Sequence, residues 1–107
     1  MKQEITAVND IVPPSVPSGG HVEGVGLHIK WQSGPLPLGQ NGAFVETVLE
    51  AARQRLEFFQ TACDRKFACR ENALAITKIE EALHWLNHRT ERRTVAGIEG
   101  TYTPDPK

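Results

Sequence analysis

Aromatic and cationic side chains gather in one short segment towards the C-terminal end of the sequence. The segment contains His84, Trp85, His88, Arg89, Arg92 and Arg93. Trp85, Arg89 and Arg93 follow one another at steps of four residues, so a helix places all three on one side. Guanidinium forks bind phosphate and an indole face stacks on a base, so the cluster suits a phosphorylated base. A structural interpretation fits equally well, because arginines near a helix C-terminus favour the helix dipole and can pair with Glu91 and Glu99.

Two more side chains with suitable chemistry flank a predicted turn between two helices. Phe59 precedes this turn and Asn72 follows it. A phenyl ring can stack on a base, and a side-chain amide can hydrogen-bond to the edge of the base. The same two residues also suit packing and helix capping, and the sequence alone leaves both interpretations open.

A metal site is not predicted, although cysteines and histidines occur in a pattern that superficially resembles zinc ligands. The four residues are Cys63, Cys69, His84 and His88. On one continuous helix the rise of 1.5 Å per residue separates Cys69 from His84 by roughly 22 Å, which is too far for a tetrahedral site. The cysteines are predicted to be free thiols, as expected in a reducing compartment.

No catalytic residue is predicted either. The sequence contains no recognisable pairing of a nucleophile with a base and no carboxylates in separated environments. Glu80 and Glu81 are sequence neighbours and point in different directions from a helix. Lys78 is predicted to form a surface ion pair with Glu81 or Glu71.

Length and charge narrow the class of protein. The chain has 107 residues, a hydrophobic content of 39% and a formal net charge of −1, which fits one soluble domain spanning residues 1–107. A protein that follows a long nucleic acid needs a basic excess, so any nucleotide partner is expected to be small. No stretch approaches the ~20 apolar residues that cross a bilayer, and a cytoplasmic protein without membrane contact is expected.

The predicted fold class is α+β, with short N-terminal antiparallel strands followed by a long antiparallel helical hairpin. Residues 1–20 are rich in proline and glycine and are interpreted as an arm or linker, part of which can pair as an edge strand. Residues 21–40 are predicted to form a small β ribbon, because Leu27, Ile29 and Trp31 alternate with polar residues.

The helical hairpin and its tail are predicted over residues 41–102. Asn41 is predicted to cap a first helix of about residues 42–60, and a second helix is predicted over about 69–93. Each helix has one apolar stripe, and its neighbour covers only part of that stripe. Two helices and a small ribbon cannot enclose a core, so at least a dimer is expected.

Two long motifs resemble a known family of phage proteins. The segments CRENALAITKIEEALHWLNHRT and GIEGT are similar to the helical hairpin of signal sponges, namely the Thoeris anti-defence proteins of the first type and the related anti-CBASS cyclic-nucleotide sponges. The segment IKWQSGPLPLGQNGAF is similar to the strand and turn before the hairpin in the Thoeris group. The resemblance covers about residues 26–102.

This resemblance implies a protein that binds immune second messengers without catalysis or cofactor, in the cytoplasm of an infected bacterial host. The implied ligands are glycocyclic ADP-ribose isomers and, in hexameric members built as trimers of dimers, cyclic dinucleotides or trinucleotides in separate pockets. The implied site residues are Phe59 for stacking on adenine, Asn72 for a hydrogen bond, Arg89 and Arg93 for ribose and phosphates, Arg70 as an anion contact, and Asn41 near a nucleotide pocket.

Helix length restricts how these residues can meet. Asn72 and Arg89 are 17 residues apart on one predicted helix, which corresponds to roughly 25 Å. Two hairpins packed antiparallel bring the turn end of one against the arginine end of the other and create two equivalent sites. Other interpretations are a sponge mainly for CBASS cyclic oligonucleotides, a helical adaptor that binds a protein, and an enzyme that degrades the messenger.

Overall fold

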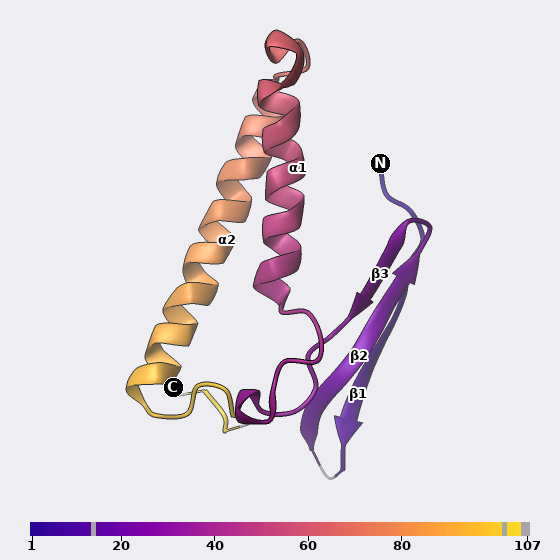
Figure 1. Cartoon of the computed structure of the whole chain (residues 1–107). Helices are drawn as coiled ribbons and strands as arrows, with labels where there is room; N and C mark the ends of the chain where they lie inside the picture. Colours follow the sequence, from indigo (N-terminus) through magenta and orange to yellow (C-terminus); the bar gives the residue numbers. More distant parts are fainter. Residues whose placement is uncertain (14, 102, 106–107) are drawn as a thin grey trace. The chain divides into compact units, whose positions relative to one another are not determined.

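The computed structural model describes residues 1–13, 15–101 and 103–105, and the chain divides into two compact units (Figure 1). The first unit comprises Met1–Phe44 together with Arg93–Lys107, and the second comprises Val45–Arg92. Tyr102, which ends the predicted tail, lies outside the described residues. Antiparallel strands followed by two long helices confirm the predicted α+β class.

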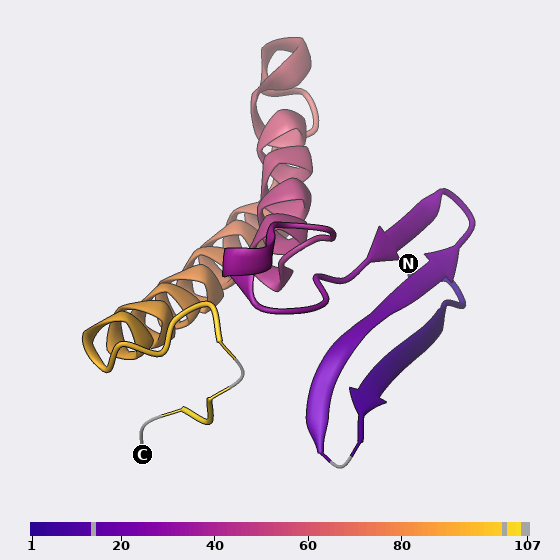
Figure 2. The same ribbon diagram turned by 60° about the horizontal axis from the view of Figure 1, so that its bottom comes forward.

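The first unit is built on a three-stranded antiparallel sheet in the order β1-β2-β3. Its strands are β1 (Thr6–Val12), β2 (Val16–Gly24) and β3 (Leu27–Lys30). Figure 2 shows β2 as a long curved strand between β1 and the shorter β3. Gly26 connects β2 to β3 with a φ of +73°, a left-handed conformation that glycine adopts without a Cβ clash.

Residues 1–20 are not an arm or linker, because β1 and the first half of β2 lie in this segment, and β1 is the edge strand that part of the segment was predicted to form. The residue pattern gives no signal for β1. All seven of its residues are exposed, so neither face of the strand requires apolar residues at alternate positions. In β2 only Gly19 and Val22 are buried. Backbone pairing on both sides therefore holds β2 in place more than its side chains do.

A compact connection follows the sheet and includes the short 3-10 helix η1 (Leu36–Leu38). Trp31 forms an isolated parallel bridge with Ala43, and the amide of Trp31 donates to the carbonyl of Gly20 at 3.0 Å. A Cβ at Gly42 would lie 2.5 Å from the carbonyl carbon and oxygen of Trp31, so only glycine fits this crossing. The connection therefore depends on a close backbone approach that no side chain could replace.

The second unit is the helical hairpin, in which α1 (Val45–Arg65) and α2 (Arg70–Val95) run antiparallel and diverge away from the turn that joins them (Figure 1). The backbone of α1 leaves the right-handed helical region at Ala62, with a ψ of 154°, and Cys63, Asp64 and Arg65 have positive φ values. Regular helix therefore ends at about Thr61, close to the predicted end. The second helix continues to Val95, two residues beyond the prediction.

The chain encloses little core, as the sequence predicts. Val22 and Ile76, each 8% exposed, are the only buried hydrophobic residues in the described part of the chain. Large apolar side chains stay exposed on the hairpin, including Phe58 at 51% and Trp85 at 68%. Such surface is typical of proteins that associate, and assembly into dimers and hexamers stays a prediction.

Candidate functional site

The turn end of the hairpin carries Phe59 on the last regular turn of α1. Its ring is half-buried, with the guanidinium carbon of Arg55 at 4.8 Å from the ring centroid. Phe58 packs edge-on against it, with the two ring centroids 5.7 Å apart. A ring held by a cation and a second ring has a defined orientation, which suits a stacking platform.

Gln60 closes the turn between the helices, and sequence reasoning missed this residue. The backbone amide of Cys69 donates to Oε1 of Gln60 at 2.9 Å, and Nε2 of Gln60 donates to the carbonyl of Cys69 at 3.1 Å. One side-chain amide thus satisfies both backbone groups of a residue nine positions away. Its signal in the sequence was weak, because one glutamine at the end of an apolar stripe looks like an ordinary surface residue.

Arg70 and Asn72 lie next to this closure, in the first turn of α2. The thiol of Cys69 accepts a hydrogen bond from the amide of Asn72 at 3.4 Å and so caps the helix, in the position where serine is commoner. Arg70 is exposed and Asn72 is half-buried. The structure therefore brings Phe59, Arg70 and Asn72 to the same end of the hairpin.

The middle and far parts of α2 carry Trp85 and Arg89. Trp85 has edge-on contacts with His84 and His88, at centroid distances of 6.2 and 6.0 Å, and it remains 68% exposed. Arg89 is exposed one turn further along the helix. The ring and the guanidinium are therefore both accessible on one side of α2.

Arg93 has a different environment, because it is buried at 4% exposure among residues of the C-terminal segment. Its Nη1 donates to the carbonyl of Thr103 at 2.8 Å and to Oδ1 of Asp105 at 2.5 Å. Its Nη2 donates to the carbonyls of Ile98 at 3.0 Å and Thr101 at 2.9 Å.

Nε of Arg93 also lies 3.2 Å from Oε2 of Glu99, which confirms the pairing with Glu99 in the structural interpretation of the arginines. The guanidinium thus holds together residues 97–101 and 103–105, which we call the strap. A role for Arg93 in binding a ligand remains a prediction. In this structure the strap already surrounds its guanidinium group.

The two groups of predicted residues lie far apart in one chain. The helix α2 is continuous from Arg70 to Val95. The 17 residues between Asn72 and Arg89 therefore correspond to roughly 25 Å along the helix axis. One hairpin cannot bring both side chains to one small ligand.

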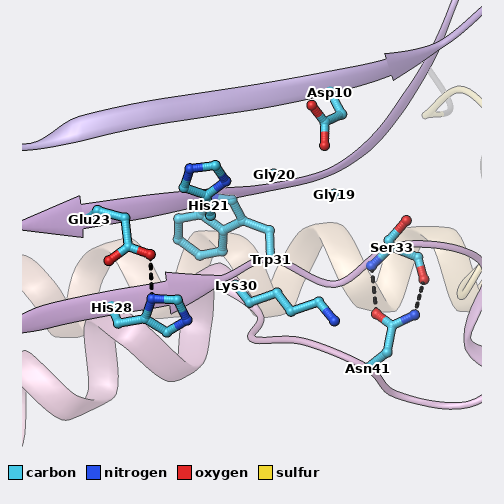
Figure 3. A pocket seen from close by; sticks show the side chains of 10 residues that line it. All are labelled: Asp10, Gly19, Gly20, His21, Glu23, His28, Lys30, Trp31, Ser33 and Asn41. Carbon is cyan, nitrogen blue, oxygen red and sulfur yellow. Dashed lines mark hydrogen bonds and ion pairs between the residues drawn. The ribbon is translucent and has the colours of Figure 1, made fainter.

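Asn41 lies in the first unit and does not cap α1, so this prediction is wrong. Its Oδ1 accepts from the amide of Ser33 at 2.9 Å, and its Nδ2 donates to the carbonyl of Ser33 at 2.7 Å (Figure 3). The helix begins later, at Val45. The backbone of Ser33 offers both a donor and an acceptor, a better match for an amide than a helix terminus, which offers only donors.

Electrostatics on the hairpin centre on Arg53, which forms a two-pronged hydrogen bond with Glu50 at 2.8 Å for each contact. This bond is the main cause that lowers the pKa of Glu50 to about 2 from its usual 4.5, with a second contribution from a hydrogen bond with Gln54. Lys78 pairs with Glu81 at 3.5 Å, one of the two partners that the sequence predicts. Local ion pairs therefore stabilise both helices.

Within the described residues, no group of three or more histidine, cysteine and acidic side chains is arranged to hold a metal ion. Cys63 and Cys69 are free and exposed. Among the same residues, no helix has the length and apolar character needed to cross a bilayer.

Comparison with known proteins gives a match to the family described as "Acb2/Tad1, hairpin domain" over residues 23–91. The chain belongs to the Acb2/Tad1 hairpin family. The match extends from the end of β2 through most of α2, so it includes Asn41, Phe59, Arg70, Asn72, Trp85 and Arg89. Arg93 lies just beyond it.

One protein to which this chain is similar is "Thoeris anti-defense 1" of Bacillus phage SBSphiJ7. The two proteins are 47% identical over 75 residues, which cover 69% of this chain. The same stretch covers 51% of the relative, so this chain spans about half the length of that protein. Within the matched residues, the hairpin formed by α1 and α2 contains five of the seven predicted site residues, namely Phe59, Arg70, Asn72, Trp85 and Arg89.

Proposed function

We propose that this protein binds and sequesters small immune second-messenger nucleotides without chemical turnover, and thereby blocks an antiviral defence of bacteria. Membership of the Acb2/Tad1 hairpin family, together with 47% identity to a protein named Thoeris anti-defense 1, carries this proposal. The expected ligands are glycocyclic ADP-ribose isomers, with cyclic dinucleotides or trinucleotides as the second class. The expected place of action is the cytoplasm of the infected host.

The messenger site is proposed to form between two copies of the chain. Phe59, Arg70 and Asn72 supply the stacking and polar groups at the turn end of one hairpin, and Trp85 and Arg89 supply a ring and a cation from the other. The continuous helix α2 supports this division, because its length keeps the two groups roughly 25 Å apart. The exposed apolar surface of the hairpin supports the association that the site requires.

Arg89 is the proposed phosphate contact that can be tested most directly. Arg93 is a poorer test residue, because its loss also releases the strap from α2. Replacing Arg89 by alanine removes a charge-assisted hydrogen bond to phosphate, and we expect the messenger affinity to fall by about tenfold or more. Lys78→Ala is the matched control, since Lys78 is an exposed cation of the same helix with its own partner, Glu81.

A mixing experiment tests the site between copies. The Asn72→Ala and Arg89→Ala variants are each expected to bind messenger poorly. Mixing them under conditions that exchange subunits should restore about a quarter of the sites, because half of the dimers are mixed and each mixed dimer has one intact site. No restoration after proven subunit exchange would refute a site shared between copies.

The mode of action is tested by incubating the protein with each messenger, denaturing it with heat and analysing the released nucleotide by chromatography and mass spectrometry. Intact messenger supports sequestration. Altered messenger would mean that the protein is an enzyme. Absence of any retained messenger would leave the helical adaptor, and retention of cyclic oligonucleotides alone would favour the sponge for CBASS signals.

A further inference from the structure

The hairpin carries a cation near its turn to which the proposed messenger site assigns no role. Arg55 lies one turn before Phe59 on α1, and its guanidinium carbon is 4.9 Å from the ring centroid of Phe58 and 4.8 Å from that of Phe59. Both distances are within the ~6 Å at which a cation attracts an aromatic ring. The spacing of three and four residues places all three side chains on one side of the helix. We call these three residues the turn cluster.

The guanidinium of Arg55 lacks the polar partners that engage its neighbour Arg53. Glu50 and Glu57 both pair with Arg53, at nitrogen–oxygen distances of 2.8 and 3.9 Å. Within the part of the chain that the structure describes, Arg55 forms no hydrogen bond and no ion pair, and its side chain is exposed. Its five N–H donors are therefore open to a ligand.

The two ring contacts leave these donors usable and restrict the side chain. A guanidinium group can contact an aromatic ring through its flat face, while its N–H groups point outward in its plane and can bind a phosphate. A side chain that two rings already hold loses less conformational freedom when a ligand binds. Arg55 is therefore a preorganised anion-binding group.

Aromatic surface that suits a base lies directly beside this cation. Phe58 is 51% exposed and Phe59 is half-buried, so both rings keep accessible surface. Bases stack on phenyl rings, and phosphates accept charge-assisted hydrogen bonds from arginine. Because the guanidinium touches both rings, one nucleotide can contact a ring with its base and Arg55 with its phosphate. The turn cluster therefore matches a phosphorylated base with groups from a single helix.

We propose that Arg55 is a further ligand-binding residue of the messenger site, where it binds a phosphate of the nucleotide whose base stacks on Phe59. This inference rests on the proposed function, because it adds a contact to the same site. The turn end of one chain then supplies a phosphate contact in addition to the ring. A fragment that carries only the base, the ribose and one phosphate should thus bind there weakly, without Arg89 of a second copy.

The experiment compares adenosine with adenosine 5′-monophosphate in titrations of the full chain, followed through ligand resonances by NMR. The wild type should bind the monophosphate about tenfold more tightly than adenosine. Arg55→Met should lower the affinity for the monophosphate about tenfold and leave that for adenosine unchanged, because methionine favours a helix and packs on rings but has no donor. The messenger affinity should also fall about tenfold in this variant.

Two control variants separate a phosphate contact from other effects. Arg55→Lys keeps the charge without the planar fork, so it should retain part of the preference for the monophosphate. Lys78→Ala removes an exposed cation of the same hairpin that has its own partner, Glu81, and should bind both ligands as the wild type does. A merely structural role of Arg55 in orienting Phe59 would weaken adenosine and the monophosphate equally, because both ligands need the ring.

Four results would overturn the inference. The first is an equal loss of adenosine and monophosphate affinity in Arg55→Met, and the second is an unchanged messenger affinity in that variant. The third is the absence of monophosphate binding by the wild type. The fourth is a preference for the monophosphate that Arg89→Ala abolishes and Arg55→Met retains, which would assign the phosphate to the second copy. Failure of the wild type to retain any messenger, with a monophosphate preference that depends on Arg55, would refute only the proposed function.

Discussion

Replacing Arg93 by alanine tests whether one buried guanidinium holds the C-terminal strap in place within the first unit. The substitution removes four hydrogen bonds, to the carbonyls of Ile98, Thr101 and Thr103 and to the carboxylate of Asp105, together with the ion pair to Glu99. A hydrogen bond to a charged group contributes about 1.5–3 kcal/mol, but such values do not add. The acceptors can regain water, because the side chain of Asp105 is already 45% exposed.

We therefore expect the strap to lose about 2–3 kcal/mol of local stability in Arg93→Ala, which is below the sum of the separate bonds. The amide of Leu36 reports on this loss directly, because it donates to the carbonyl of Gly100 within the strap at 3.0 Å. At 1.4 kcal/mol for each factor of ten, its hydrogen exchange should accelerate by roughly 30- to 140-fold. Arg93→Lys should give only partial rescue, because an ammonium group has three donors and lacks the planar fork.

The assay is amide hydrogen exchange measured by NMR on the wild type, Arg93→Ala and Lys78→Ala. Lys78 is an exposed cation on the same helix with its own partner, Glu81, so its variant should exchange at the wild-type rate. The amide of Cys69, which Gln60 protects at the distant turn, should not change in any variant. Exchange of the Leu36 amide within about threefold of wild type in Arg93→Ala, less than ~0.7 kcal/mol, would refute the role of Arg93 as the holder of the strap.

Two other predictions concern the hairpin. Gln60→Ala should destabilise the turn by about 1–2 kcal/mol and accelerate exchange of the Cys69 amide. Gln60→Glu keeps the acceptor for that amide, so it should lose less stability. Equal exchange of the Cys69 amide in the wild type and both variants would contradict this prediction. Because the pKa of Glu50 is lowered to about 2 by Arg53, the stabilisation from this pair is complete above pH 4.5 and is lost as the pH falls towards 2. Glu50→Gln should therefore lower the melting temperature at pH 7 but not near pH 2, as measured in thermal scans by circular dichroism. Two outcomes would count against this reasoning. One is a difference in melting temperature between wild type and Glu50→Gln that does not depend on pH, and the other is the same effect from Glu46→Gln at an exposed position.

Periodic patterns in the sequence were enough to predict the helices and the third strand. The apolar stripes of the hairpin and the alternation of Leu27, Ile29 and Trp31 are local consequences of burying one face of an element. The thin core followed from the same patterns, since the number of stripes exceeded the surfaces that could cover them. The 25 Å separation along α2 also followed from the sequence, because the rise of a helix is constant.

Contacts between residues distant in the sequence were decided only by the tertiary structure. Asn41 hydrogen-bonds to the backbone of Ser33 and does not cap a helix, and Gln60 holds the turn by a hydrogen bond to the backbone of Cys69. Arg93, which the sequence places among the cations near the end of a helix, is buried at the centre of the strap. Each outcome depends on which hydrogen-bonding groups arrive within about 3 Å of one another, and periodicity carries no information on that distance.

The first strand is a second kind of feature that residue patterns do not predict. All of β1 is exposed, so its residues meet no requirement for alternation, and backbone hydrogen bonds to β2 define it. The sequence by itself determined the elements that bury one apolar face and the reach of the long helix. The tertiary structure decided where polar side chains find their partners, because that choice depends on three-dimensional proximity and on competition between donors and acceptors.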